Sequence, residues 1–184
     1  MKWNRIARRI RVPLGFLLVV FCLWIARPTL ASILAGSTIT AIGLGIRAYA
    51  SGYVRKNEDL ATTGPYALTR NPLYLGSIIL ALGFALTARS WAVAVVLVVM
   101  FVAIYLPVIR GEEAFLRERF PAFPEYERKV PRLIPRFRSF LSGFLEMQGA
   151  FSPDLYLQHR EYNALLGALA IMALLAVKLV WFSR

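Results

Sequence analysis

Hydrophobic residues gather into five long runs along the chain, and polar residues fill the stretches between them. The runs cover residues 12–26, 30–49, 73–87, 91–109 and 163–182. A helix needs about 20 apolar residues to cross the hydrocarbon core of a bilayer, and the second, fourth and fifth runs have this length. The first and third runs are short and would tilt less or include flanking polar residues. The pattern predicts an all-α integral membrane protein with about five transmembrane helices.

The composition agrees with a protein that is solvated by lipid. Hydrophobic residues make up 58% of the chain and charged residues 17%, against roughly 45–50% and 25% in soluble domains. The net charge of +12 would favour nucleic-acid binding in a soluble protein. Here the charges lie mainly between apolar runs, so no nucleic-acid partner is expected. Cys22 and His159 are single residues of their kinds, and no metal site is predicted.

The basic residues set an expected orientation. They concentrate before the first run, between the second and third, and between the fourth and fifth. By the positive-inside rule, the N-terminus and both long loops are cytoplasmic and the C-terminus is outside, in a bacterial inner membrane. A cleaved signal peptide is the alternative for the first run, but the turn at Arg27-Pro28 into another apolar run favours a retained helix. Residues 88–90 predict a second tight turn between helices.

We expect one membrane domain over residues 1–184. Residues 1–50 would form a helix hairpin, residues 51–135 a core that contains a second hairpin, and residues 136–184 a tail with the last transmembrane helix. In the second run, Gly36, Gly43 and Gly45 predict close packing between helices.

The first long loop, residues 57–76, has the features of a ligand site. Gly64-Pro65 and Asn71-Pro72 are turn signals, and Pro72 suits the first position of a helix. The amino end of a helix carries free N–H groups and a partial positive charge, which favour a carboxylate or phosphate. The alternative is a capped helix start at which Arg70 reaches to lipid headgroups.

The second long loop, residues 109–135, begins with an acidic pair. Glu112 and Glu113 follow directly after an apolar helix, where a carboxylate is costly and therefore a functional candidate. Aromatic and apolar residues then alternate with basic ones, which predicts short amphipathic helices on the membrane surface; these residues are Phe115, Leu116, Phe120, Phe123 and Tyr126. We expect Arg70, Tyr74 and the acidic pair to converge on one ligand. A membrane-hugging loop with internal salt bridges is the alternative.

At these residues the chain resembles the isoprenylcysteine carboxyl methyltransferase and phospholipid methyltransferase superfamily of integral membrane enzymes, as a bacterial-type member. The first motif matches at Leu60, Thr62, Gly64, Tyr66, Arg70, Pro72, Tyr74 and Gly76. The second matches at Glu112, Glu113, Leu116, Phe120, Tyr126, Val130, Pro131, Ile134 and Pro135. Two motifs joined by a hairpin are more specific than one short pattern. Asn71 replaces the usual histidine, and Val108 stands where members that act on prenylated cysteine carry arginine.

The resemblance implies S-adenosylmethionine as the methyl donor and S-adenosylhomocysteine as its product. The implied cofactor site is formed by Asp59, Leu60, Ala61, Tyr66, Arg70, Asn71, Pro72, Leu73, Tyr74 and Glu112. Glu112 can accept hydrogen bonds from the ammonium or the ribose hydroxyls of the donor. Asn71 and the helix start can meet its carboxylate, and Tyr66 and Tyr74 can flank the adenine or the sulfonium.

Methyl transfer from an activated donor depends mainly on positioning, so few catalytic groups are expected. Arg110 would orient an anionic acceptor, and Glu113 would accept a proton or hold Arg110. The expected acceptor is a lipid-like or prenylated molecule with a carboxylate, an amine or a similar group, reached from the bilayer. Membrane lipids are expected neighbours, and self-association through the transmembrane helices stays open.

Two alternatives to a methyltransferase remain. Sterol-type membrane reductases carry a similar Arg-x-Pro-x-Tyr-x-Gly motif near a nicotinamide site, so an NADPH-dependent reductase is the alternative enzyme. The paired glutamates and the segment 130–135 favour the methyltransferase. A non-catalytic membrane scaffold of the same fold is the other alternative, and Asn71 and Val108 support it.

Overall fold

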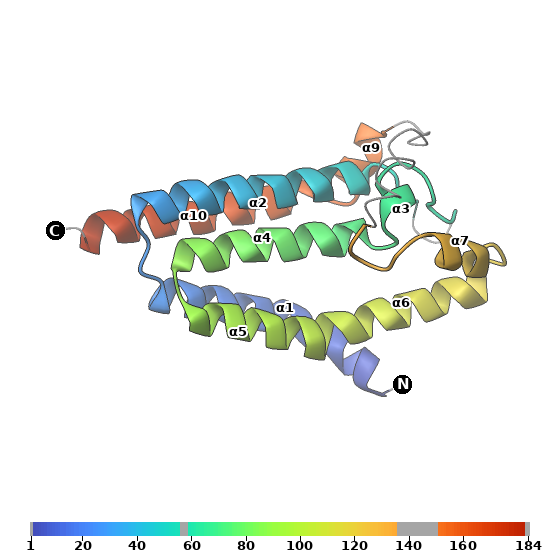
Figure 1. Ribbon diagram of the computed structural model, residues 1–184, viewed down its shortest axis with the longest axis horizontal. Helices are drawn as coiled ribbons and strands as arrows, with labels where there is room; N and C mark the ends of the chain where they lie inside the picture. Colours follow the sequence, from blue (N-terminus) through green and yellow to red (C-terminus); the bar gives the residue numbers. More distant parts are fainter. Residues whose placement is uncertain (1, 56–58, 136–150, 183–184) are drawn as a thin grey trace. The chain divides into compact units, whose positions relative to one another are not determined.

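The computed structural model describes residues 2–55, 59–135 and 151–182, and within them the chain forms helices and no strand. The helices that contain the apolar runs are α1 (Lys2–Ile25), α2 (Leu30–Ser51), α4 (Pro72–Ala88), α5 (Trp91–Met100) and α10 (Tyr162–Phe182) (Figure 1). The others are α3 (Pro65–Leu68), the π helix η1 (Phe101–Tyr105), α6 (Leu106–Arg119), α7 (Phe123–Lys129) and α9 (Pro153–Gln158). The predicted all-α class is confirmed, while residues 136–150 of the predicted tail lie outside the described residues.

In the part of the chain that the structure describes, three helical stretches are long and apolar enough to cross a membrane: Leu30–Ser51, Trp91–Arg119 and Tyr162–Trp181. Two shorter apolar helices cover Pro13–Ile25 and Pro72–Ala88. All five predicted apolar runs are therefore helical, and the first and third are the short ones, as expected. That the two short helices also cross the membrane stays a prediction.

The two predicted turns are present, and local chemistry explains them. Helix α1 ends before Arg27-Pro28, and the amide of Arg27 donates to the carbonyl of Ala88 at 3.0 Å. At the start of α2, the amide of Thr29 donates to Ser32 Oγ at 2.9 Å and the amide of Ser32 to Thr29 Oγ1 at 3.3 Å. These bonds satisfy donors that a helix start leaves open.

The chain divides into two compact units. Unit 1 contains Met1–Ala41, Leu80–Ala114 and Gly167–Arg184, and unit 2 contains Ile42–Ile79 and Phe115–Leu166. The apolar core of unit 1 is formed by Cys22, Ala26, Ala88, Val93 and Leu175. Cys22 is 5% exposed and packs there as a small buried hydrophobic residue.

Within unit 1, α2 and α4 approach closely through glycine. A Cβ on Gly36 would overlap Thr87 Oγ1 and would lie 2.6 Å from the carbonyl oxygen of Gly83. Thr87 is fully buried, and its hydroxyl donates to that same carbonyl at 3.0 Å. The predicted packing role of Gly36 is confirmed. The same prediction is wrong for Gly45, because a Cβ there would have no neighbour within 4 Å.

The helix that begins at Trp91 contains a π-helical segment before the acidic pair. Residues Phe101–Tyr105 form η1, and Pro107 follows in the first turn of α6. Proline has no N–H to donate to the carbonyl four residues earlier, so the regular α-helical pattern is interrupted there. Such π segments are frequent at functional sites.

Candidate functional site

The first motif begins in unit 2 with a turn that only glycine can make. Gly64 has φ 57° and precedes α3. A Cβ on Gly64 would lie 2.5 Å from the ring of Tyr53, so both the backbone and the space exclude a side chain. Of the predicted cofactor residues here, Asp59 is exposed, whereas Tyr66 is buried with 7% of its surface exposed.

The predicted helix start at Pro72 is confirmed. Thr69 ends α3 with extended backbone, and Pro72 is the first residue of α4. Asn71 is 9% exposed, and its amide N–H donates to Thr69 Oγ1 at 3.4 Å. Leu73 and Tyr74 follow in the first turn and are half-buried. In general, the amide groups in the first turn of an α-helix have no carbonyl four residues earlier in the helix, so they can donate to a ligand or to another part of the protein.

The end of the second motif lies against this helix start along a series of hydrogen bonds, which we call the motif seam. The amide of Arg70 donates to the carbonyl of Pro131 at 2.9 Å. The carbonyl of Arg132 accepts from Thr69 Oγ1 at 3.1 Å and from Asn71 Nδ2 at 3.0 Å. The structure thus brings together two segments that the sequence predicted to share a site, and it assigns the Asn71 side chain to joining them.

Helix α7 extends the motif seam. The hydroxyl of Tyr126 donates to the carbonyl oxygen of Tyr66 at 2.7 Å. Phe123 is 1% exposed and meets the Tyr126 ring edge-on, with 6.1 Å between ring centroids. The prediction that Phe123 lies on the membrane surface is wrong, because its side chain fills the interior of the protein. Phe115 is 47% exposed, as an amphipathic segment would have it.

Arg70 is held by a carboxylate that the sequence analysis did not single out. Arg70 Nη1 donates to Glu127 Oε1 at 2.6 Å, and Arg117 Nη2 donates to Glu127 Oε2 at 2.6 Å. The hydrogen bond from Arg117, assisted by the one from Arg70, lowers the pKa of Glu127 despite its partial burial. The side chain of Arg70 is 9% exposed, that of Glu127 is 24% exposed and that of Arg117 is 48% exposed, so the cluster runs from a buried arginine to an exposed one. A direct contact of Arg70 with a cofactor stays a prediction.

The predicted catalytic residues and Glu112 come from one turn of α6, in unit 1. Arg110 is exposed, Glu112 is half-buried, and Glu113 is 3% exposed. A buried carboxylate at the end of an apolar helix is the kind of group that is retained for function. Convergence of these side chains with the first motif stays a prediction.

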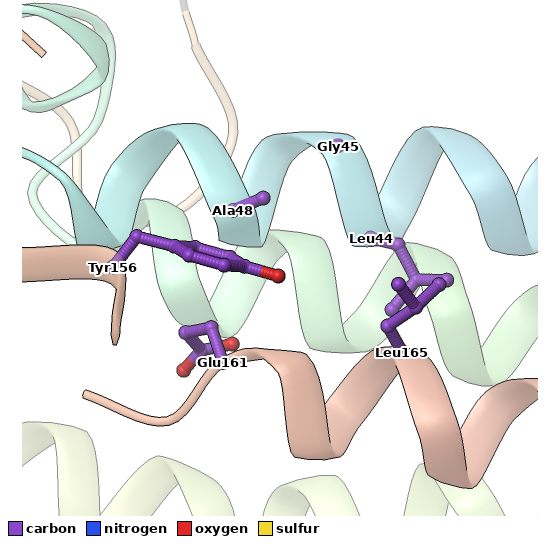
Figure 2. Close-up of a pocket in the computed structure, with 6 residues that line it drawn as sticks. All are labelled: Leu44, Gly45, Ala48, Tyr156, Glu161 and Leu165. Carbon is purple, nitrogen blue, oxygen red and sulfur yellow. The ribbon is translucent and has the colours of Figure 1, made fainter. Parts of the chain in front are cut away.

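A pocket of about 150 Å³ lies elsewhere in unit 2, and none of the predicted site residues lines it. Figure 2 shows its lining residues, which are Leu44, Gly45, Ala48, Tyr156, Glu161 and Leu165. The ring of Tyr156 extends along the pocket beside α2, with Glu161 next to it (Figure 2). Pockets for whole cofactors are about 300–1,000 Å³, so this space is too small for the methyl donor.

Comparison with known proteins adds the decisive observation. A family model described as phospholipid methyltransferase matches residues 10–122, which include the whole first motif, α4 and the paired glutamates. The chain belongs to the phospholipid methyltransferase family. Its membership agrees with the resemblance seen in the two motifs and with the helices suited to a membrane. No solved structure matches this family member.

Two curated relatives of this phospholipid methyltransferase family member carry names from metal resistance. The cobalt-zinc-cadmium resistance protein CzcN of Cupriavidus metallidurans is 40% identical over 114 residues, which are 61% of this chain and 52% of that protein. The nickel-cobalt-cadmium resistance protein NccN of Alcaligenes xylosoxydans xylosoxydans is 35% identical over 135 residues, 72% of this chain and 62% of that protein. The match thus spans between half and two thirds of each relative.

Proposed function

We propose that this protein is a membrane methyltransferase that uses S-adenosylmethionine to methylate a lipid-like or prenylated acceptor reached from the bilayer. The motif seam carries the proposal, since it joins two motifs that lie 60 residues apart at Tyr66 and Tyr126. A seam with four hydrogen bonds fixes the start of α4 against the end of the second motif. Methyl transfer depends on holding donor and acceptor in the right relative position, and a rigid arrangement of the binding segments favours this.

The chemistry of the described residues fits the donor. The start of α4 suits a carboxylate, because a helix start carries a partial positive charge, while the amide N–H and the side chain of Asn71 donate within the protein. Tyr66 and Tyr74 offer aromatic faces for the adenine or the sulfonium, and Glu112 offers a carboxylate for the ammonium or the ribose hydroxyls. When bound, the donor supplies a methyl group that its positive sulfur has already activated.

The chain's own residues bind, orient and move a proton. Arg110 is exposed and would attract an acceptor that carries a negative charge. An amine acceptor must lose a proton, and the buried carboxylate of Glu113 would accept it. With a carboxylate acceptor no proton is released, and Glu113 would instead hold Arg110. We place the site on the cytoplasmic side of a bacterial inner membrane.

Titration of the purified protein in detergent with S-adenosylhomocysteine tests the donor site. Glu112→Gln removes a charge-assisted hydrogen bond, and we expect the dissociation constant to rise about tenfold or more. Glu118→Gln, an exposed position in the same helix, is the matched control and should leave it unchanged. Equal affinity of the Glu112→Gln variant and the wild type would contradict the proposed site.

A parallel titration with NADPH separates the alternatives. Stabilisation by NADPH alone would replace the methyltransferase with a sterol-type reductase, and binding of neither ligand would favour a scaffold.

The acceptor can then be sought by mass spectrometry of lipid extracts incubated with a labelled methyl donor. Because both relatives are named for metal resistance, extracts from cells grown with and without cobalt, zinc and cadmium salts should be compared.

A further inference from the structure

Arg47 is a charged residue inside the apolar helix α2, and its guanidinium contacts Glu161 and the first turn of α4, both in unit 2. Its Nη2 donates to Glu161 Oε1 at 2.9 Å and to Glu161 Oε2 at 2.8 Å, and its Nε donates to Oε2 at 3.1 Å. The side chains of Arg47 and Glu161 are 22% and 12% exposed. A charge within a membrane helix is costly unless it is paired inside the protein, and such residues are usually functional.

The remaining nitrogen of the guanidinium reaches the first turn of α4. Arg47 Nη1 donates to the carbonyl oxygen of Leu73 at 3.3 Å and to the hydroxyl of Ser77. Ser77 Oγ in turn donates to the carbonyl of Leu73 at 2.8 Å. Leu73 is the second residue of α4, so Arg47 binds the turn that the proposed function assigns to the methyl donor.

The last glycine of the first motif makes room for this arginine. A Cβ on Gly76 would lie 2.7 Å from Arg47 Cγ and 2.8 Å from the carbonyl oxygen of Gly43. The Arg47 stem therefore crosses α4 directly over Gly76. This contact gives the motif glycine a physical role, which is to bring α2 close enough for Arg47 to reach Leu73.

Glu161 comes from a different part of the chain. It lies between α9 and α10, whereas the family match ends at residue 122. The two carboxylate oxygens bind the guanidinium side-on, which fixes its plane as well as its position. A lysine at position 47 could not replace it, because an ammonium group lacks this fork of donors.

We propose that Arg47 and Glu161 are positioning residues that hold the first turn of α4 in the orientation in which it receives the methyl donor. Glu161 orients Arg47, and Arg47 fixes Leu73 and Ser77. The segment that follows the family match thus contributes to the donor site. That this turn receives the methyl donor rests on the proposed function. That Arg47 and Glu161 order the start of α4 does not depend on it.

Two measurements on the purified protein in detergent test the proposal. The first is the dissociation constant of S-adenosylhomocysteine, and the second is hydrogen–deuterium exchange of the amides of residues 73–76. We expect Glu161→Gln to weaken binding about tenfold, a typical coupling between sites, and to speed this exchange. Arg47→Lys should do the same. Glu125→Gln, which breaks the exposed pair with Lys129, is the control and should change neither.

A double-mutant cycle separates positioning from a general loss of stability. Because Glu161 acts through Arg47, Glu161→Gln should have no further effect on binding in an Arg47→Met background. Removing one partner of a largely buried pair can prevent folding, whereas removing both charges is better tolerated. The Arg47→Met/Glu161→Leu variant therefore serves as the folded test, and it should still bind weakly and exchange fast.

Unchanged exchange at residues 73–76 in that folded double variant would overturn the proposal. Additive effects of the two single substitutions on binding would also overturn it, because they would show that Glu161 does not act through Arg47. If the wild type binds no S-adenosylhomocysteine, the proposed function fails. The exchange measurement then decides by itself whether Arg47 and Glu161 order the start of α4.

Discussion

Two glycines on neighbouring helices of unit 2 differ in what a side chain would meet. A Cβ on Gly76 would come within 2.8 Å of Arg47 Cγ and the carbonyl of Gly43, whereas one on Gly45 would have no neighbour within 4 Å. We expect Gly76→Ala to cost about 1–3 kcal/mol, because backbone or the Arg47 stem must move. Gly45→Ala should be neutral or stabilise by up to about 1 kcal/mol, because alanine favours helix.

Thermal unfolding of both variants in the same detergent measures this difference. Gly45→Ala is the matched control, since it makes the same chemical change in open space. Similar melting temperatures for the two variants would show that α2 and α4 are not in contact at Gly76, and the account of Arg47 would then lose its basis.

The same residues show how far a sequence can predict a site. Asn71-Pro72 could be placed at a helix start because local turn chemistry marks it. The partners of Arg47 and Arg70 could not be predicted, because Glu161 and Glu127 lie 114 and 57 residues away along the chain. The sequence does show that Arg47 and Lys178 need partners inside the protein, because each is a charge within an apolar run. Lys178 donates to the carbonyls of Leu23 and Trp24 at 2.7 and 2.8 Å.

At the scale of elements, Glu127 of helix α7 binds Arg70, which lies just before α4, and Arg117. The stability that these ion pairs contribute depends on pH. The hydrogen bond from Arg117, and then that from Arg70, lowers the pKa of Glu127 below that of an unfolded glutamate. A lowered folded-state pKa stabilises the protein above the unfolded value of about 4.3. This contribution is lost as the pH falls from that value through the folded-state pKa.

We therefore expect Glu127→Gln to lower the free energy of unfolding by about 1–2 kcal/mol at pH 7, and by less at pH 4. Melting curves of the variant and the wild type at both pH values measure the effect. Glu125→Gln, two positions earlier in α7, removes an exposed pair and should leave the free energy of unfolding nearly unchanged. A pH-independent loss in Glu127→Gln would mean that the lost stability comes from packing instead of charge.

Element identity was more predictable than element detail. Apolar runs of 15 or more residues could only form helices in a bilayer, because every backbone polar group must be satisfied within the chain. Their ends followed the Arg27-Pro28 and Ala88–Ser90 turns. The π segment Phe101–Tyr105 was not predicted, because its sequence is as apolar as the α-helix around it. The burial of Phe123 was missed because an aromatic residue between charges fits a membrane surface as well as a protein interior.

At the scale of the molecule, three exposed tryptophans in unit 1 lie near the ends of apolar helices. Trp24, Trp91 and Trp181 are 78%, 88% and 80% exposed, and each lies within two residues of the end of an apolar helix. Tryptophan is enriched at membrane–water interfaces. In the expected orientation all three of these helix ends face the outside. Because tryptophan is enriched at both interfaces, it does not distinguish the two sides, and the orientation stays a prediction from the basic residues.

Cysteine labelling tests this topology on a chain that has one native cysteine, the buried Cys22. In a Cys22→Ala background, Thr62→Cys and Glu118→Cys place thiols at exposed positions within the two motifs, and Ser90→Cys places one in the turn between α4 and α5. A membrane-impermeant maleimide should label positions 62 and 118 only in inverted vesicles, because the basic loops are cytoplasmic. Position 90 should be labelled only in intact cells. Labelling of 62 and 118 from opposite sides would separate the first motif from the paired glutamates by a bilayer, and Glu112 could then take no part in a donor site at the start of α4.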